Sequence, residues 1–145
     1  MLDLRRFRPR SGKNRYFVAP SLAIHGEADR DAPVYAMAPR ELADALYAVI
    51  MAEPRIKVVD RTQDGLAMQV IQRSRVFRFP DTVDIEAIAL NPQQSSVALY
   101  SRSRYGRRDF GVNRRRIEDW LDKLAAKIGR DKIVQPANAA RPATA

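Results

Sequence analysis

The sequence predicts an α+β domain, a two-layer sandwich in which two helices cover a four-stranded antiparallel sheet. Three patterns predict it: a helical apolar period before residue 54, four short alternating segments between residues 56 and 103, and a second helical period after residue 112. The expected order of elements is α-β-β-β-β-α. Because both helices can pack on the same side, we expect the other face of the sheet to be wet or available to a partner.

The first helix is expected to open at Ala38-Pro39, because proline suits the first helical turn. Its apolar residues recur at i, i+4, i+7 and i+8, which places them on one buried stripe. The stripe comprises Leu42, Leu46, Val49 and Ile50. The helix should end near Glu53-Pro54.

Four strands are expected over residues 56–61, 66–74, 82–90 and 96–103. Turn signals stand between them at Asp64-Gly65, Pro80-Asp81 and Asn91-Pro92. Connections this short suit hairpins rather than parallel crossovers, so the sheet should be an antiparallel meander. The face of opposite parity is predicted to be partly exposed because it carries polar residues, namely Gln69, Arg73, Asp84 and Glu86.

The second helix is expected over residues 113–128, with Gly129 placed to end it. Its apolar stripe comprises Ile117, Leu121, Leu124 and Ile128. Residues 34–130 should therefore form a single domain, preceded by a basic arm over residues 1–33. Within the arm, residues 16–18 either add an edge strand or pack on the domain. The tail over residues 131–145 is expected to be disordered, since it has no bulky apolar residue after Val134.

Composition excludes several kinds of chemistry. The 145 residues contain no cysteine, which excludes thiol catalysis, disulfides and iron–sulfur clusters. The single histidine, His25, cannot form a two-histidine metal site within one chain and has no identifiable serine partner, so we interpret it as a packing or surface residue. Gly106 and Gly111 match neither a Walker nor a dinucleotide-binding pattern. We expect no catalytic residue, metal or cofactor, and a protein that is not an enzyme.

The chain shows no signal for export or membrane insertion. No apolar h-region follows the basic residues at the start, and no run approaches the roughly 18 apolar residues that a membrane helix needs. We therefore expect a soluble protein without a transmembrane segment. The bacterial cytoplasm is the expected compartment, with peripheral attachment to a membrane as an alternative.

The most unusual stretch is residues 101–116, which contain seven arginines and a single carboxylate, Asp109. One interpretation is an anion site, in which hydroxyls, loop amides and arginines bind a phosphate or carboxylate while Asp109 and Asn113 organise the loop and one or the other caps the following helix. The candidate residues are Ser101, Ser103, Arg104, Asp109, Asn113, Arg114 and Arg116. The other interpretation is structural: Asp109 and the acidic residues of the helix satisfy the arginines internally.

The spacing of this stretch, Ser-x-Ser-Arg-x-Gly-x-x-Asp-x-Gly-x-Asn-Arg-x-Arg, resembles the C-terminal hallmark of a bacterial and plastid family known as domain of unknown function 1499. The similarity extends upstream through Phe79-x-Asp81 and covers roughly residues 39–128. The family has no established reaction, so the resemblance implies no activity. Many relatives carry a Cys-Pro-x-Ser-Pro-Asn-Cys segment near the start, where this chain has Ala19-Pro20-Ser21-Leu22.

The net charge of +9 indicates anionic partners. We expect a non-enzymatic module that binds a small anion or an acidic protein surface through the arginine-rich loop and helix start. The first alternative is nonspecific RNA or DNA binding, favoured by a pI near 10.5 and by Tyr100, Tyr105 and Phe110 among the arginines. The second is attachment to anionic membranes through the basic residues of the arm, from Arg5 to Arg15.

Overall fold

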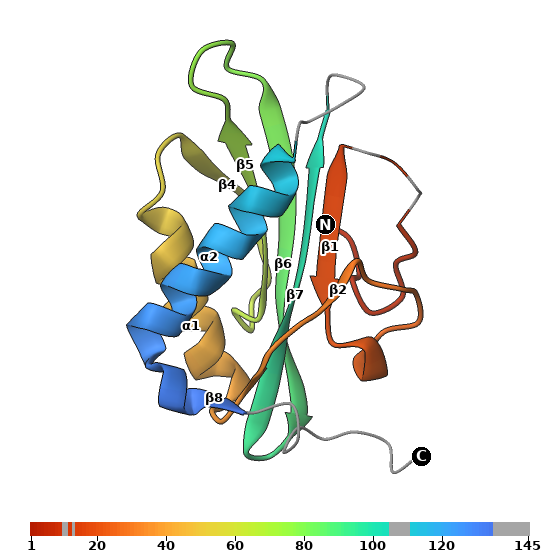
Figure 1. Cartoon of the computed structure of the whole chain (residues 1–145), viewed down its shortest axis with the longest axis vertical. Helices are drawn as coiled ribbons and strands as arrows, with labels where there is room; N and C mark the ends of the chain where they lie inside the picture. Colours follow the sequence, from red (N-terminus) through yellow and green to blue (C-terminus); the bar gives the residue numbers. More distant parts are fainter. Residues whose placement is uncertain (10–11, 13, 105–110, 135–145) are drawn as a thin grey trace.

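The computed structural model of the chain describes residues 1–9, 12, 14–104 and 111–134. Two helices lie on one face of a sheet of eight strands (Figure 1). The elements in chain order are β1 (Arg15–Ala19), the short 3₁₀ helix η1 (Ser21–Ala23), β2 (Arg30–Asp31), β3 (Val34–Tyr35), α1 (Pro39–Met51), β4 (Ile56–Arg61), β5 (Ala67–Arg73), β6 (Pro80–Asn91), β7 (Gln94–Ser103), α2 (Val112–Ile128), the short 3₁₀ helix η2 (Arg130–Lys132) and β8 (Ile133–Val134).

The predicted antiparallel meander is confirmed, since β4, β5, β6 and β7 are successive antiparallel neighbours. The prediction of four strands was too low. β1 pairs antiparallel with β7, β2 pairs parallel with β1, and the two-residue strands β3 and β8 extend the far end of β7. The strands of two residues are too short to show an alternation of buried and exposed residues in the sequence. Of the two alternatives for residues 16–18, the strand is the one that forms, as β1, although β2 lies outside it in the sheet. Residues 16–19 are buried and form one continuous apolar run, so alternation is missing there.

The main core lies between the helices and the sheet, and both predicted helices are confirmed. α1 begins at Pro39 and buries Leu42, Leu46 and Ile50. α2 buries Ile117, Trp120, Leu121 and Leu124 against the same sheet face, and it ends at Gly129, whose φ of 95° favours glycine. This packing fixes the start of α2 over one end of the sheet.

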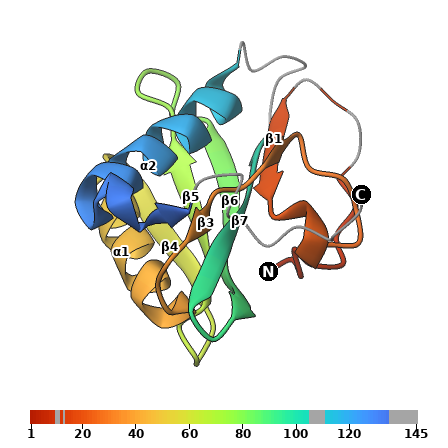
Figure 2. The same cartoon turned by 60° about the horizontal axis from the view of Figure 1, so that its bottom comes forward.

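The sequence predicted that the second face of the sheet would be wet or available to a partner. The structure shows that part of this face is covered. Figure 2 shows the N-terminal segment on the side of the sheet opposite the helices. There Leu4 is buried, and the ring of Phe7 lies 4.5 Å from that of Tyr100 and 5.9 Å from that of Phe17, measured between centroids. Six buried residues form this second cluster: Leu4, Phe17, Ala19, Ile88, Ala98 and Tyr100. Apolar residues of the arm therefore complete the fold instead of remaining in solvent.

Asp84 departs from the predicted exposure of its face, because the N-terminal segment encloses it. The residue is fully buried, while Arg73 on the same face is exposed. Its carboxylate accepts hydrogen bonds from the backbone N–H of Leu2 at 3.3 Å, from the amide of Gln69 at 3.0 Å and from Arg102 at 2.7 Å. Buried charge of this kind needs such partners.

The tail predicted to be disordered begins at residue 131. Residues 131–134 belong to η2 and β8, and residues 135–145 lie outside the described residues.

Candidate anion-binding site

Arg116 is the centre of a hydrogen-bonded network where the start of α2 meets the ends of β5, β6 and β7. Its guanidinium donates to the hydroxyl of Ser101 and the amide oxygen of Asn113, both at 2.9 Å. It also donates to Asp81 at 2.7 Å and to Gln72 at 2.6 Å. The side chains of the Arg116–Asp81 ion pair are only 8% and 10% exposed. A buried pair with this many hydrogen bonds holds the helix start on the sheet.

Asn113 joins this network to β7 and to the segment before β1. Its amide nitrogen donates to the backbone oxygen of Asn14 and to the hydroxyl of Ser103, both at 2.9 Å. Its amide oxygen accepts from the hydroxyl of Ser101 at 2.6 Å. Of the two alternative caps for α2, Asn113 does not take that role: the residue lies inside the helix, which starts after Gly111 at a φ of 78° without a side-chain cap bond. The amide oxygen that a cap would use to accept a backbone N–H accepts hydrogen bonds from Ser101 and Arg116 instead.

Two further candidates of the motif are arginines at the protein surface. Arg104 and Arg114 are exposed. The guanidinium carbon of Arg114 lies 5.9 Å from the ring centroid of Tyr16, within the range of a cation–π contact. Burial raises the pKa of Tyr16, and its hydrogen bond to Glu118 raises it further, while the positive charge of Arg114 opposes the shift. Asp109 lies outside the described residues.

The structural interpretation of the motif expected internal carboxylate partners, and the structure shows one for Arg116. Glu118 pairs with Arg30 and Asp119 with Lys123, whereas the motif arginine that is buried pairs with Asp81 from β6. The spacing of residues along a helix cannot reveal a partner that lies on a strand 35 residues away in the chain. The described residues of the motif thus divide into two groups. A hydrogen-bonded scaffold of buried and half-buried side chains comprises Ser101, Ser103, Asn113 and Arg116 with Asp81, and the exposed arginines are Arg104, Arg114 and Arg115.

Sequence reasoning did not single out a second group of cations at the same end of the molecule. We call Arg55, Arg73, Arg75 and Arg78 the hairpin arginines, because they surround the β5–β6 hairpin. Figure 1 shows this hairpin at the same end as the start of α2 and the end of β7. All four are exposed, and none forms a salt bridge in the part of the chain that the structure describes. Three of them fall within residues 73–78, the signal that was available in the sequence.

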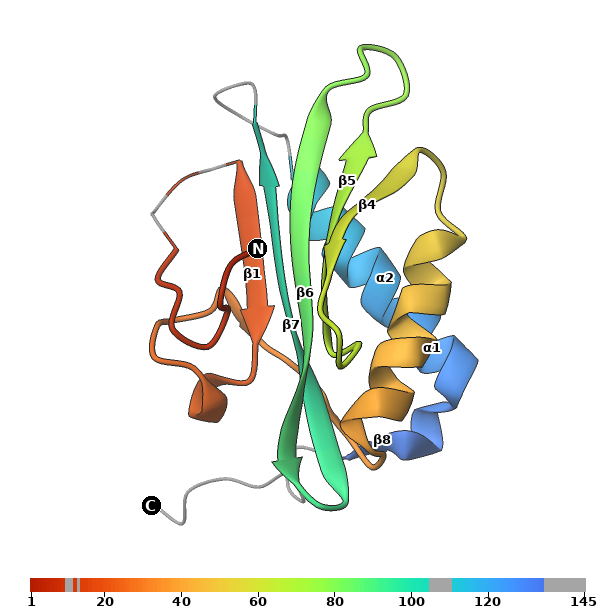
Figure 3. The ribbon, with the colours of Figure 1, turned by 180° about the vertical axis from the view of Figure 1, so that it is seen from behind.

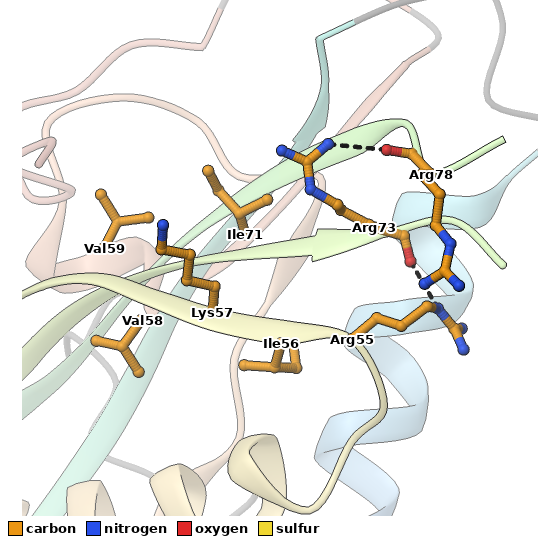
Figure 4. Close-up of a pocket in the computed structure, with 8 residues that line it drawn as sticks. All are labelled: Arg55, Ile56, Lys57, Val58, Val59, Ile71, Arg73 and Arg78. Atoms are coloured by element: carbon orange, nitrogen blue, oxygen red, sulfur yellow. Dashed lines mark hydrogen bonds between the residues drawn. The ribbon is translucent and has the colours of Figure 1, made fainter.

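Backbone carbonyls, rather than carboxylates, hold two of the hairpin arginines. Arg55 donates to the carbonyl of Arg73 and Arg73 donates to the carbonyl of Arg78, both at 2.9 Å (Figure 4). Arg55 and Arg78 each have a φ of 58°, a left-handed conformation that costs a residue with a side chain roughly 1–2 kcal/mol. These contacts order the guanidinium groups while leaving their charges uncompensated.

A groove of about 520 Å³ runs along β4 beside these arginines. Figure 4 shows Lys57, Val59 and Ile71 projecting from the strands of the groove, with Arg73 near its hairpin end. The complete lining is Arg55, Ile56, Lys57, Val58, Val59, Ile71, Arg73 and Arg78. The groove therefore combines an apolar wall with four cationic side chains.

The fold is an α+β domain with two helices on one face of a sheet, and comparison with known families identifies the family to which it belongs. Residues 14–124 match the model of a family described as Protein of unknown function (DUF1499). The match covers more than half of the chain, and the chain belongs to this family. No protein with a curated description matches it. Within the described ranges, no helix is long and apolar enough to cross a membrane.

Proposed function

We propose that the chain is a non-enzymatic binding module whose basic end binds a phosphate-bearing anion. By basic end we mean the hairpin arginines together with the exposed motif arginines Arg104, Arg114 and Arg115. The observation that carries the proposal is the lack of a salt bridge at all four hairpin arginines within the described part of the chain. Like charges held close together repel one another, and a bound anion relieves that repulsion.

The kind of cation supports phosphate as the group recognised. A guanidinium presents several donors in a planar fork that matches phosphate oxygens. Lys57 is the single lysine of the groove, and the other cations there are arginines. In this proposal Arg104 and Arg114 contribute from the motif, while the buried network around Arg116 holds α2 in place.

Nucleic acid binding through the aromatic residues of the motif receives less support. Tyr100 is 6% exposed, with Phe7 against its ring and the Arg102 guanidinium carbon 4.9 Å from its centroid. A ring covered in this way has no free face for a base. Tyr105 and Phe110 lie outside the described residues.

A titration with short inorganic polyphosphate tests the proposal. We expect the double variant Arg75→Gln/Arg78→Gln to bind about tenfold more weakly than the wild type, because two cations near the anion are removed. The matched control is Arg5→Gln/Arg6→Gln, which removes two arginines of the arm that have carboxylate partners. Equal weakening in both variants would show that only the net charge matters and would overturn the proposed site.

A second pair of variants tests the motif itself. Arg104→Gln/Arg114→Gln should also weaken polyphosphate binding while leaving the melting temperature close to that of the wild type, because both side chains are exposed. Unchanged binding in this variant would restrict the site to the hairpin. Unchanged binding in every variant would refute the proposed function.

A further inference from the structure

We propose that the basic end docks on the surface of an anionic phospholipid membrane, with the tip of the β5–β6 hairpin entering the bilayer. This rests on the proposed function and names the source of the phosphate. Two features carry it: an exposed apolar tip and the cations placed around that tip.

The tip of the hairpin exposes three large apolar side chains. Val76 is 75% exposed, Phe77 73% and Phe79 49%. The rings of Phe77 and Phe79 stack at 5.5 Å between centroids, with their planes 18° apart. Figure 3 shows the hairpin extending past the neighbouring end of β4, on the far side from the chain's N-terminus. A contiguous apolar tip that projects from the fold indicates a surface made for contact with another apolar phase.

The cations around the tip match the layered chemistry of a bilayer. Residues 65–80 contain three arginines and no Asp or Glu. Arg75 and Arg78 alternate with the apolar residues. Their long side chains can therefore reach the lipid phosphates while the phenylalanine rings enter the acyl region below. Negatively charged lipids attract such cations strongly near the membrane surface.

The groove beside the hairpin supplies a place for a lipid head group. Arg55, Arg73 and Lys57 line it, and Val59 and Ile71 form an apolar wall (Figure 4). Its volume of about 520 Å³ lies within the usual range for sites of small molecules. Cations beside apolar side chains suit a phosphate attached to a glycerol backbone.

Other occupants fit these observations less well. An added peptide strand would have to pair with β4, but the register of β4 shifts between Val58 and Asp60, and its edge carries Lys57; both features oppose edge-to-edge pairing. Single-stranded nucleic acid would match the arginines, but the two rings of the tip face each other. A membrane satisfies the apolar tip and the cations together.

Co-sedimentation of the full-length chain with vesicles tests the proposal. We expect binding to vesicles containing roughly 30% phosphatidylglycerol and much weaker binding to phosphatidylcholine alone. The variant Val76→Ser/Phe77→Ser should bind the anionic vesicles about tenfold more weakly, because apolar area no longer enters the bilayer. Its polyphosphate affinity should stay within about twofold of the wild type, since no charge changes. Leu22→Ser is the control, because Leu22 is 59% exposed on η1, away from the hairpin.

The variant Phe77→Trp reports on the depth of insertion without relying on affinity. Anionic vesicles should shift its emission to shorter wavelength, and lipids brominated on their acyl chains should quench it. The native Trp120 is 1% exposed in the core, so its own emission serves as an internal reference. Emission of Phe77→Trp that stays unshifted in the presence of bound vesicles would overturn the insertion.

The outcomes separate the two proposals. If the serine variant binds vesicles as well as the wild type does, the hairpin tip does not insert, while the anion site of the proposed function survives. If the wild type binds neither vesicles nor polyphosphate, both proposals are wrong. If the wild type ignores vesicles and the serine variant loses affinity for single-stranded RNA, the tip is a platform for bases and the membrane proposal is wrong.

Discussion

Two arginine-rich regions of this protein differ in how their charge is compensated. In the N-terminal arm, Arg5 lies 2.9 Å from Glu86 and Arg15 lies 2.8 Å from Asp29. The four hairpin arginines form no salt bridge with any residue that the structure describes. Arginine content alone therefore does not determine whether these charges are available to a ligand. Compensation by a carboxylate, which depends on tertiary contacts, distinguishes cations that hold the fold together from cations free to attract an anion.

The arginines of the arm are less suited to attract an anion than the hairpin arginines. From the sequence, attachment to anionic membranes through the arm was an alternative to anion binding at the motif. The structure instead packs Leu4 and Phe7 of that segment against the sheet and gives Arg5, Arg6 and Arg15 carboxylate partners. The arm stabilises the second face of the sheet, and we assign the attraction of anions to the hairpin arginines.

The largest expected effect concerns Arg116, the extreme case of a compensated arginine. Arg116→Ala should lower the free energy of unfolding by about 3–5 kcal/mol, because it leaves Asp81 buried without its partner. Urea denaturation followed by circular dichroism measures it. Arg114→Ala, on an exposed neighbour in the same helix, should change stability by less than about 0.5 kcal/mol. Similar losses in both variants would break the division between scaffold and exposed arginines.

An intermediate effect is expected at Arg78, where a cation occupies a left-handed backbone. Arg78→Gly should raise the free energy of unfolding by about 1 kcal/mol, because glycine adopts a φ of 58° without steric cost. The same variant should bind polyphosphate more weakly. Opposite changes in stability and binding would indicate that the charge is retained there for a ligand. A loss of stability would instead indicate that the side chain itself supports the hairpin.

The smallest effects test charge compensation directly through salt. Arg15→Gln should lower stability by about 0.5–1 kcal/mol at low salt, because an ion pair with Asp29 is lost. Arg75→Gln should raise it by a few tenths of a kcal/mol, since repulsion from neighbouring arginines falls. Both differences should shrink as salt screens the charges. Thermal melts at two ionic strengths measure them, and the same sign for both variants would contradict the comparison.

The local patterns in the chain were sufficient for most of the main elements. Pro39 and Gly129 mark the start of one helix and the end of the other. The apolar stripes of both helices are buried where predicted, apart from Ile128, which is half-buried. The meander from β4 to β7 followed from alternation and short turns. The same patterns left β1 as one of two alternatives for residues 16–18, because its buried residues lack alternation. They misjudged Asp84, whose burial depends on a segment more than 80 residues away.

For the candidate site, the motif over residues 101–116 contained the residues that form the buried network, but it did not reveal their partners. Ser101, Ser103, Asn113 and Arg116 do come together, yet they bond one another and Asp81. The sequence by itself determined the element order, the helix ends and the excess of arginine, because these depend on residues close in the chain. Only the tertiary structure decided which arginines have carboxylate partners and which lie beside an exposed apolar tip, because charge compensation and burial are set by residues that meet only once the sheet has formed.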